Sequence, residues 1–140
     1  MKPVCLVIGA GAGIGGTVGK RFAREGYHAV LCRRSDEEGL QTLVTAIEDE
    51  GGSATGFLLN AIEDDAIENQ IATVEAEIGP IEVVVYNLGA QIGNRALEDT
   101  SYKAFEMGWR MATFGLFRTA SVLCPLMEER GKGTFLVTSA

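Results

Sequence analysis

The sequence has few cysteines and histidines, which build disulfide frameworks and metal centres, and it has no long apolar run. Its 140 residues include three cysteines, Cys5, Cys32 and Cys124, and one histidine. The cysteines lie in or beside apolar stretches without a CxxC pair, which predicts buried free thiols in a reducing compartment. No apolar run approaches the roughly 20 residues that cross a bilayer, and the N-terminal segment is too short for a secretory signal. We therefore expect a soluble, cytoplasmic protein with no membrane partner.

Positive charge is also scarce. The chain carries 12 Lys and Arg against 19 Asp and Glu, a formal net charge of −7, and its basic residues are mostly single. A nucleic-acid partner would need a clustered basic face, so none is expected. The single histidine, His28, precedes an apolar segment, and we expect it to be a surface residue rather than a catalyst.

Short apolar runs alternate with segments of helical periodicity along the whole chain. The runs predict buried strands at residues 4–8, 29–32, 55–59, 81–86 and 134–138. Between them, apolar residues recur at intervals of three and four, and glycines at 26, 51, 52 and 79 end the expected helices. This order predicts an α/β fold with a doubly wound, Rossmann-like parallel sheet, because parallel strands need helical crossovers. No shift in composition divides residues 1–140, so we expect one dinucleotide-binding domain.

A glycine-rich stretch, VIGAGAGIGGTVGKRF at residues 7–22, joins the first expected strand to the first expected helix. In one register Gly9 makes the tight turn, Gly13 admits a pyrophosphate and Gly15 allows close packing of helix and strand. In a second register Gly11, Gly13 and Gly16 match the dinucleotide fingerprint but begin two residues later. Either register predicts that the helix N-terminus binds the phosphates of a dinucleotide.

Several segments, taken in order, resemble the short-chain dehydrogenase/reductase family. Residues 9–15 resemble its TGxxxGIG turn, with Ile8 where threonine is usual, and residues 86–89 (Tyr-Asn-Leu-Gly) resemble its NNAG segment. Residues 60–61 (Asn-Ala) stand where the family usually has Asp-Val beside the adenine. With the second-strand arginines discussed next, the cofactor-binding candidates are Gly9, Gly11, Gly13, Ile14, Gly15, Arg33, Arg34, Asn60, Ala61, Asn87, Leu88 and Gly89.

The end of the second expected strand carries information on the cofactor. An NAD enzyme of this architecture places an acidic residue there for the ribose 2′-hydroxyl, whereas this chain has Cys32 followed by Arg33 and Arg34. A guanidinium can bind a 2′-phosphate in two-pronged fashion, so NADP is expected in preference to NAD. The alternative is that these arginines are solvated, or pair with Asp36 and Glu37.

The resemblance breaks down at the catalytic positions. Residues 109–117 resemble the family's long fifth helix, but Ala112 stands where an asparagine is usual. The family serine falls on Ala140, with Ser139 one residue early, so it is either displaced or beyond the chain. No tyrosine is followed four residues later by the lysine of the family's acid–base pair. No catalytic residue is therefore assigned.

The resemblance implies an NAD(P)-dependent oxidoreductase that moves hydride between nicotinamide and a small-molecule carbonyl or alcohol. We expect this chain to be its cofactor-binding half, truncated after the fifth strand and inactive alone; a natural minimal protein is the alternative. The helix from Phe105 to Met127 should expose apolar surface and join subunits of a homo-oligomer. A second hypothesis, favoured slightly by Ala112, is a non-catalytic dinucleotide sensor or scaffold.

Overall fold

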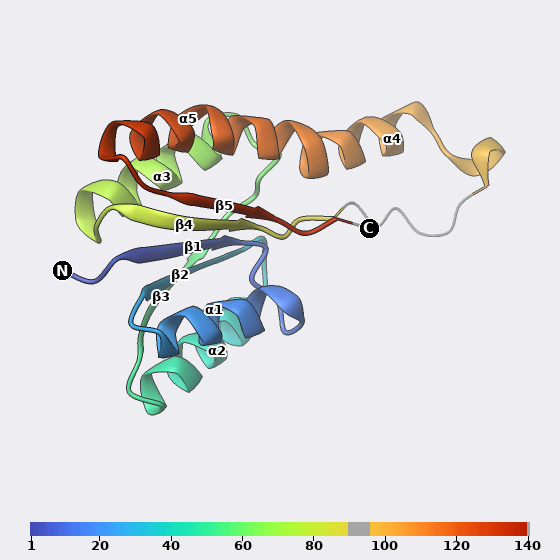
Figure 1. The fold of residues 1–140 in the computed structure, drawn as a ribbon. Helices are drawn as coiled ribbons and strands as arrows, with labels where there is room; N and C mark the ends of the chain where they lie inside the picture. The colour runs from blue at the N-terminus through green and yellow to red at the C-terminus, as the bar shows by residue number, and fades with distance from the viewer. Residues whose placement is uncertain (90–95, 140) are drawn as a thin grey trace.

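A computed structural model describes residues 1–89 and 96–139 and shows one sheet between two layers of helices (Figure 1). The parallel sheet is 5-stranded, in the order β3-β2-β1-β4-β5. Its strands are β1 (Val4–Ile8), β2 (His28–Arg33), β3 (Ser53–Leu58), β4 (Ile81–Tyr86) and β5 (Thr134–Val137). The doubly wound α/β prediction is confirmed, and the strands differ from the expected ones only at their ends.

The helices lie on both faces of the sheet, because right-handed crossovers that extend the sheet in opposite directions place their helices on opposite faces. Helices α1 (Ile14–Arg24) and α2 (Glu37–Asp49) cover one face, and α3 (Ala66–Glu77) and α5 (Gly115–Arg130) cover the other (Figure 1). Helix α4 (Tyr102–Trp109) continues the line of α5 past the end of the sheet, after a short 3-10 turn at Leu97–Asp99. No helix in the described ranges is long and apolar enough to span a membrane.

The central strand β1 is buried on both faces because its side chains alternate between the two layers. Val4, Leu6 and Ile8 pack in the cluster beneath α3 and α5. Cys5 and Val7 pack in the cluster beneath α1 and α2. A continuous apolar run is therefore the pattern that this strand needs.

The long helix expected from Phe105 to Met127 is interrupted. A π-helical turn, η2 (Arg110–Phe114), separates α4 from α5. The buried phenol of Tyr86, at the end of β4, donates a hydrogen bond to the carbonyl of Met111 in this turn. A Cβ on Gly115 would collide with the same phenol oxygen. The wide turn thus has a partner in the sheet, which periodicity in the sequence could not reveal.

Two of the three cysteines are buried as expected and one is not. Burial raises the pKa of Cys5 and of Cys32 to about 12, so both remain thiols. Cys124 is exposed, and the prediction of a buried thiol there is wrong. The buried stripe of α5 contains Leu123 and Met127, and Cys124 lies beside it on the solvent side.

Candidate dinucleotide-binding site

The carboxyl ends of β1 and β4 meet where the topology of the sheet changes direction. From β1 the chain builds β2 and β3 on one side and then β4 and β5 on the other. In open α/β sheets, ligands bind outside the carboxyl ends of the strands at such a switch point. The candidate site is therefore the edge of the sheet that carries the glycine-rich turn.

Asn87 connects the ends of β1, β4 and β5 through hydrogen bonds at this point. Its backbone amide donates to the carbonyl of Ile8 (2.8 Å), and its side-chain amide donates to the carbonyl of Gly9 (3.0 Å). The hydroxyl of Thr138, just after β5, donates to Asn87 Oδ1 (2.7 Å). Asn87 therefore supports the glycine turn through its backbone and side chain. Leu88, half-buried, and Gly89, exposed, follow it at the rim.

The turn has glycine at different positions for different physical reasons. Gly9 adopts φ +97°, and a Cβ there would collide with the carbonyl oxygen of Asn87. A Cβ on Gly15 would collide with the carbonyl oxygen of Gly9 and lie 2.9 Å from its carbonyl carbon. A Cβ on Gly13 would meet no atom of the described residues within 4 Å. Packing thus requires glycine at 9 and 15, whereas Gly13 borders open space.

The backbone amides that border this space are available to a ligand. Within the described part of the chain, the amides of Ala12, Gly13, Ile14 and Gly15 have no hydrogen-bond acceptor, whereas the Gly16 amide donates to the carbonyl of Gly11 (2.9 Å). In residues 1–89 and 96–139, no side chain caps the N-terminus of α1. Unpaired amides and the helix dipole together favour a bound anion. The turn therefore fits the pyrophosphate of a dinucleotide.

Arg33 ends β2 beside this turn. Its Nη1 lies 3.1 Å from Asp36 Oδ2, and its Nη2 lies 3.8 Å from where a Cβ on Gly11 would stand. Asp36 Oδ1 also accepts from the amide of Gly39 and so caps α2. The pairing with Asp36 that the sequence left open is present, and it holds the guanidinium between the glycine turn and the start of α2. Arg34 is exposed.

The loop after β3 lies at the same edge of the sheet. The amide of Leu59 donates to the carbonyl of Arg33 (2.8 Å), which joins the ends of β3 and β2. Asn60 Oδ1 accepts from the amide of Ile62 (3.3 Å), so this side chain closes its own turn. The side chain of Ala61 is buried in the core.

Arg118, which the sequence analysis missed, connects α5 to this loop. Its guanidinium donates to both carboxylate oxygens of Glu68 (2.8 and 2.7 Å) and to the carbonyls of Ala61 (2.8 Å) and Glu63 (3.0 Å). The hydrogen bond from Arg118 lowers the pKa of Glu68, and the same bond raises the pKa of Arg118. The available signal was one charged residue in the otherwise uncharged segment 111–127.

The positions that match catalytic residues of the resembled family, as far as the structure describes them, carry no acid–base group. Ala112 lies half-buried in the π-helical turn, Ser139 is exposed, and Ala140 lies outside the described residues. Across residues 1–89 and 96–139, no group of His, Cys, Asp and Glu could hold a metal ion.

His28 is more constrained than expected for a surface residue. It is the first residue of β2, half-buried, with Nδ1 3.1 Å from Ser53 Oγ and Nε2 2.9 Å from Thr55 Oγ1. Burial, and then the charge of Lys2, lower its pKa. Its contacts join β2 to β3 away from the glycine turn.

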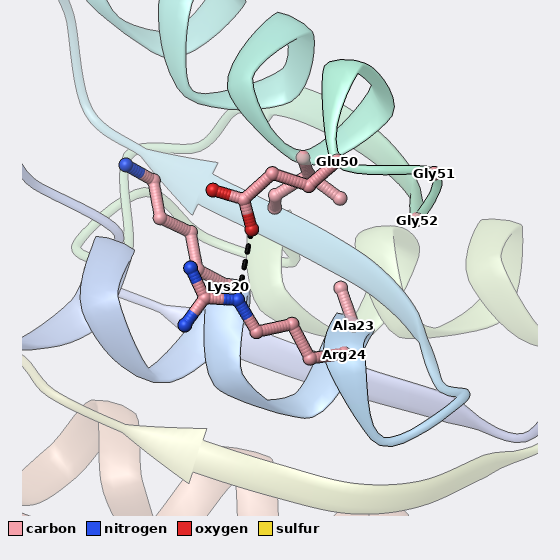
Figure 2. A pocket seen from close by; sticks show the side chains of 7 residues that line it. Lys20, Ala23, Arg24, Glu50, Gly51 and Gly52 are labelled. Atoms are coloured by element: carbon pink, nitrogen blue, oxygen red, sulfur yellow. Dashed lines mark hydrogen bonds and ion pairs between the residues drawn. The ribbon is translucent and has the colours of Figure 1, made fainter.

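A separate surface pocket lies between the ends of α1 and α2 (Figure 2). Arg24 Nε lies 2.8 Å from Glu50 Oε2, with Lys20 beside them. Both helices run antiparallel to the strands, so their C-terminal ends lie at the amino edge of the sheet. This pocket is therefore not part of the candidate site.

The parallel sheet, its switch point and the glycine turn define a dinucleotide-binding α/β protein. The chain belongs to the short chain dehydrogenase family, which its residues 3–140 match.

Known relatives extend beyond the length of this chain. A fatty acyl-CoA reductase of Acinetobacter baylyi is 31% identical over 139 residues, which are 98% of this chain and 46% of the relative. A short-chain dehydrogenase structure from Rhodopseudomonas palustris superposes with a TM-score of 0.90 at 32% identity, covering 98% of this chain and 63% of that one. A gluconate 5-dehydrogenase from Burkholderia cenocepacia, in complex with NADP and tartrate, gives 0.83 at 28% identity, covering 98% and 53%. The chain thus spans about half the length of the curated relatives it matches.

Proposed function

We propose that this chain is the cofactor-binding half of an NADP-dependent oxidoreductase acting on a small-molecule carbonyl or alcohol. The observation that carries the proposal is the glycine turn, whose amides from Ala12 to Gly15 have no acceptor among the described residues and face open space at Gly13. Bound NADP supplies the hydride chemistry at its nicotinamide ring. The chain's own contribution is to bind and orient the dinucleotide along the carboxyl edge of the sheet.

The proposed site extends to both sides of the glycine turn. On the β2 and β3 side, Arg33, Arg34, Asn60 and Ala61 would border the adenosine half. On the β4 side, the segment from Asn87 through Leu88 to Gly89 would border the nicotinamide half. Ile14, whose side chain is 61% exposed, stands at the rim between them.

The preference for NADP rests on Arg33. Its side chain is only 14% exposed and is held by Asp36 close to Gly11, so the guanidinium is already placed beside the turn. β2 ends in Cys32 and Arg33 rather than in an acidic residue, and the nearby Asp36 carboxylate is already paired with Arg33. The gluconate 5-dehydrogenase relative that contains NADP supports the same choice of cofactor.

Titration of the 140-residue chain with NADPH and with NADH tests this proposal. If one charge-assisted hydrogen bond to the 2′-phosphate contributes about 1.5–3 kcal/mol, NADPH should bind about 10- to 100-fold more tightly than NADH. Arg33→Ala should remove most of this preference and leave NADH affinity unchanged. Arg24→Ala, at the opposite edge of the sheet, is the matched control and should change neither affinity.

Two results would contradict the role of Arg33. An equal loss of both cofactors would mean that Arg33 supports the fold of the turn. Unchanged NADPH binding would mean that Arg33 serves only to pair with Asp36.

We also propose that the complete protein is a cytoplasmic homo-oligomer that associates through α4 and α5. The support is apolar surface on these helices: Phe105 and Phe117 are each 67% exposed, and Trp109 is 45% exposed. The rings of Trp109 and Phe114 stack with centroids 5.2 Å apart, which gives this surface a rigid aromatic element.

A further inference from the structure

Two arginines of α5 form ion pairs with α3, and they differ in one respect. Arg118 pairs with Glu68, and Arg130 pairs with Glu75. The two helices lie side by side on the sheet (Figure 1). Arg118 alone of these two also donates to backbone carbonyls, those of Ala61 and Glu63. The ion pair between α5 and α3 therefore does not account for the hydrogen bonds from Arg118 to the backbone.

The extra donors of Arg118 hold the loop after β3. Among the described residues, the side chain of Asn60 bonds within the loop alone, to the amide of Ile62 and to Glu63 Oε1, both at 3.3 Å. The bonds from Arg118 are shorter, at 2.8 and 3.0 Å, and come from a side chain that is 10% exposed. The guanidinium carbon lies over the ring of Phe114, 5.8 Å from its centroid. Arg118 thus ties the loop to the rigid helix layer.

This loop borders the half of the candidate site that contains Arg33. The amide of Leu59 donates to the carbonyl of Arg33, so the loop begins beside the end of β2. If Arg33 binds the 2′-phosphate, the adenosine half must lie across the ends of β2 and β3. The loop that Arg118 holds would then border the adenine base.

We propose that Arg118 is a positioning residue for the adenosine half of the cofactor, which acts by fixing the carbonyls of Ala61 and Glu63. It does not itself touch the cofactor. The inference rests on the proposed function, because it requires a dinucleotide at the carboxyl edge of the sheet. It predicts that Arg118 affects adenosine binding without affecting phosphate binding at the glycine turn.

The test is calorimetric titration of the 140-residue chain with NADPH and, separately, with inorganic pyrophosphate. Arg118→Met should weaken NADPH binding about tenfold, because the loop after β3 loses the hydrogen bonds that hold it in place. The affinity for pyrophosphate should stay within about twofold of wild type. Arg130→Met is the matched control, because it removes the other ion pair between α5 and α3. It should leave both ligands within about twofold of wild type. Circular dichroism establishes that each variant is folded.

Each outcome separates the inference from the proposed function. If wild type fails to bind NADPH, the proposed function is wrong and this inference falls with it. If wild type binds NADPH but Arg118→Met matches Arg130→Met, or weakens both ligands equally, only this inference is wrong. If Arg118→Met does not fold, Arg118→Lys replaces it: a lysine lacks the planar fork, so NADPH affinity should fall about threefold with pyrophosphate unchanged. Equal affinities in Arg118→Lys and wild type would overturn the inference.

Discussion

The same substitution at two glycines of the turn should have opposite consequences. Gly13→Ala places a methyl group in open space beside amides without acceptors, whereas Gly15→Ala drives one into the backbone of Gly9. We therefore expect Gly13→Ala to weaken dinucleotide binding with little loss of stability. We expect Gly15→Ala to destabilise the fold itself.

The magnitudes follow from the contacts. At Gly15 the new Cβ would lie 2.9 Å from the carbonyl carbon of Gly9 and 3.0 Å from Cα of Ala10, both backbone atoms that cannot rotate away. Overpacking of this kind costs about 1–3 kcal/mol, or roughly 3 to 12 °C in the melting temperature. At Gly13, loss of the glycine N-cap costs at most about 1 kcal/mol. Displacing the phosphate from one charge-assisted bond costs about 1.5–3 kcal/mol, or roughly 10- to 100-fold in affinity.

Thermal melting by circular dichroism and titration with NADPH measure the two effects on the same samples. The reasoning is refuted if Gly13→Ala binds NADPH like wild type, because the open space would then not be the phosphate site. It is equally refuted if Gly13→Ala melts as low as Gly15→Ala, because the two glycines would then share one packing role.

Three further predictions concern Tyr86 and His28, which lie outside the glycine turn. Tyr86→Phe leaves the carbonyl of Met111 without its donor and should lower the stability of the fold by about 1–3 kcal/mol in thermal melts. The control is Tyr102→Phe, which should have no effect because this side chain is 96% exposed. Equal melting temperatures of the two variants would argue against the contact between Tyr86 and Met111. Burial raises the pKa of Tyr86 to about 12, so spectrophotometric titration of the folded chain should show a phenol that ionises well above the usual tyrosine pKa of about 10. Because burial and Lys2 lower the pKa of His28 from 6.5, the unfolded chain takes up a proton first as the pH falls. The contribution of neutral His28 to the stability of the fold is therefore complete above pH 6.5 and is lost as the pH falls through the folded-state pKa. Melting temperatures measured against pH should show this loss, and His28→Gln should reduce it. An unchanged pH dependence in His28→Gln would contradict the lowered pKa of His28.

Much of the architecture could be predicted from local sequence patterns. The continuous apolar run of β1 specifies a strand buried on both faces, and Gly26 and Gly51 adopt positive φ just after α1 and α2. Alternation of such strands with amphipathic helices leaves a parallel, doubly wound sheet as the consistent arrangement. The glycine turn, too, was visible in the sequence, because its position between strand and helix is a local property.

Only the tertiary structure decided which residues meet at the site. Asn87 supports Gly9 across 78 residues of sequence, Arg118 holds Ala61 across 57, and Tyr86 reaches Met111 across 25. Periodicity specifies which face of an element is apolar, but it does not specify which carbonyl a buried donor will find. That choice depends on the order of strands in the sheet and the layer on which each helix packs. For the same reason, the sequence left the pairing of Arg33 open, and the fold placed its guanidinium between Asp36 and the glycine turn.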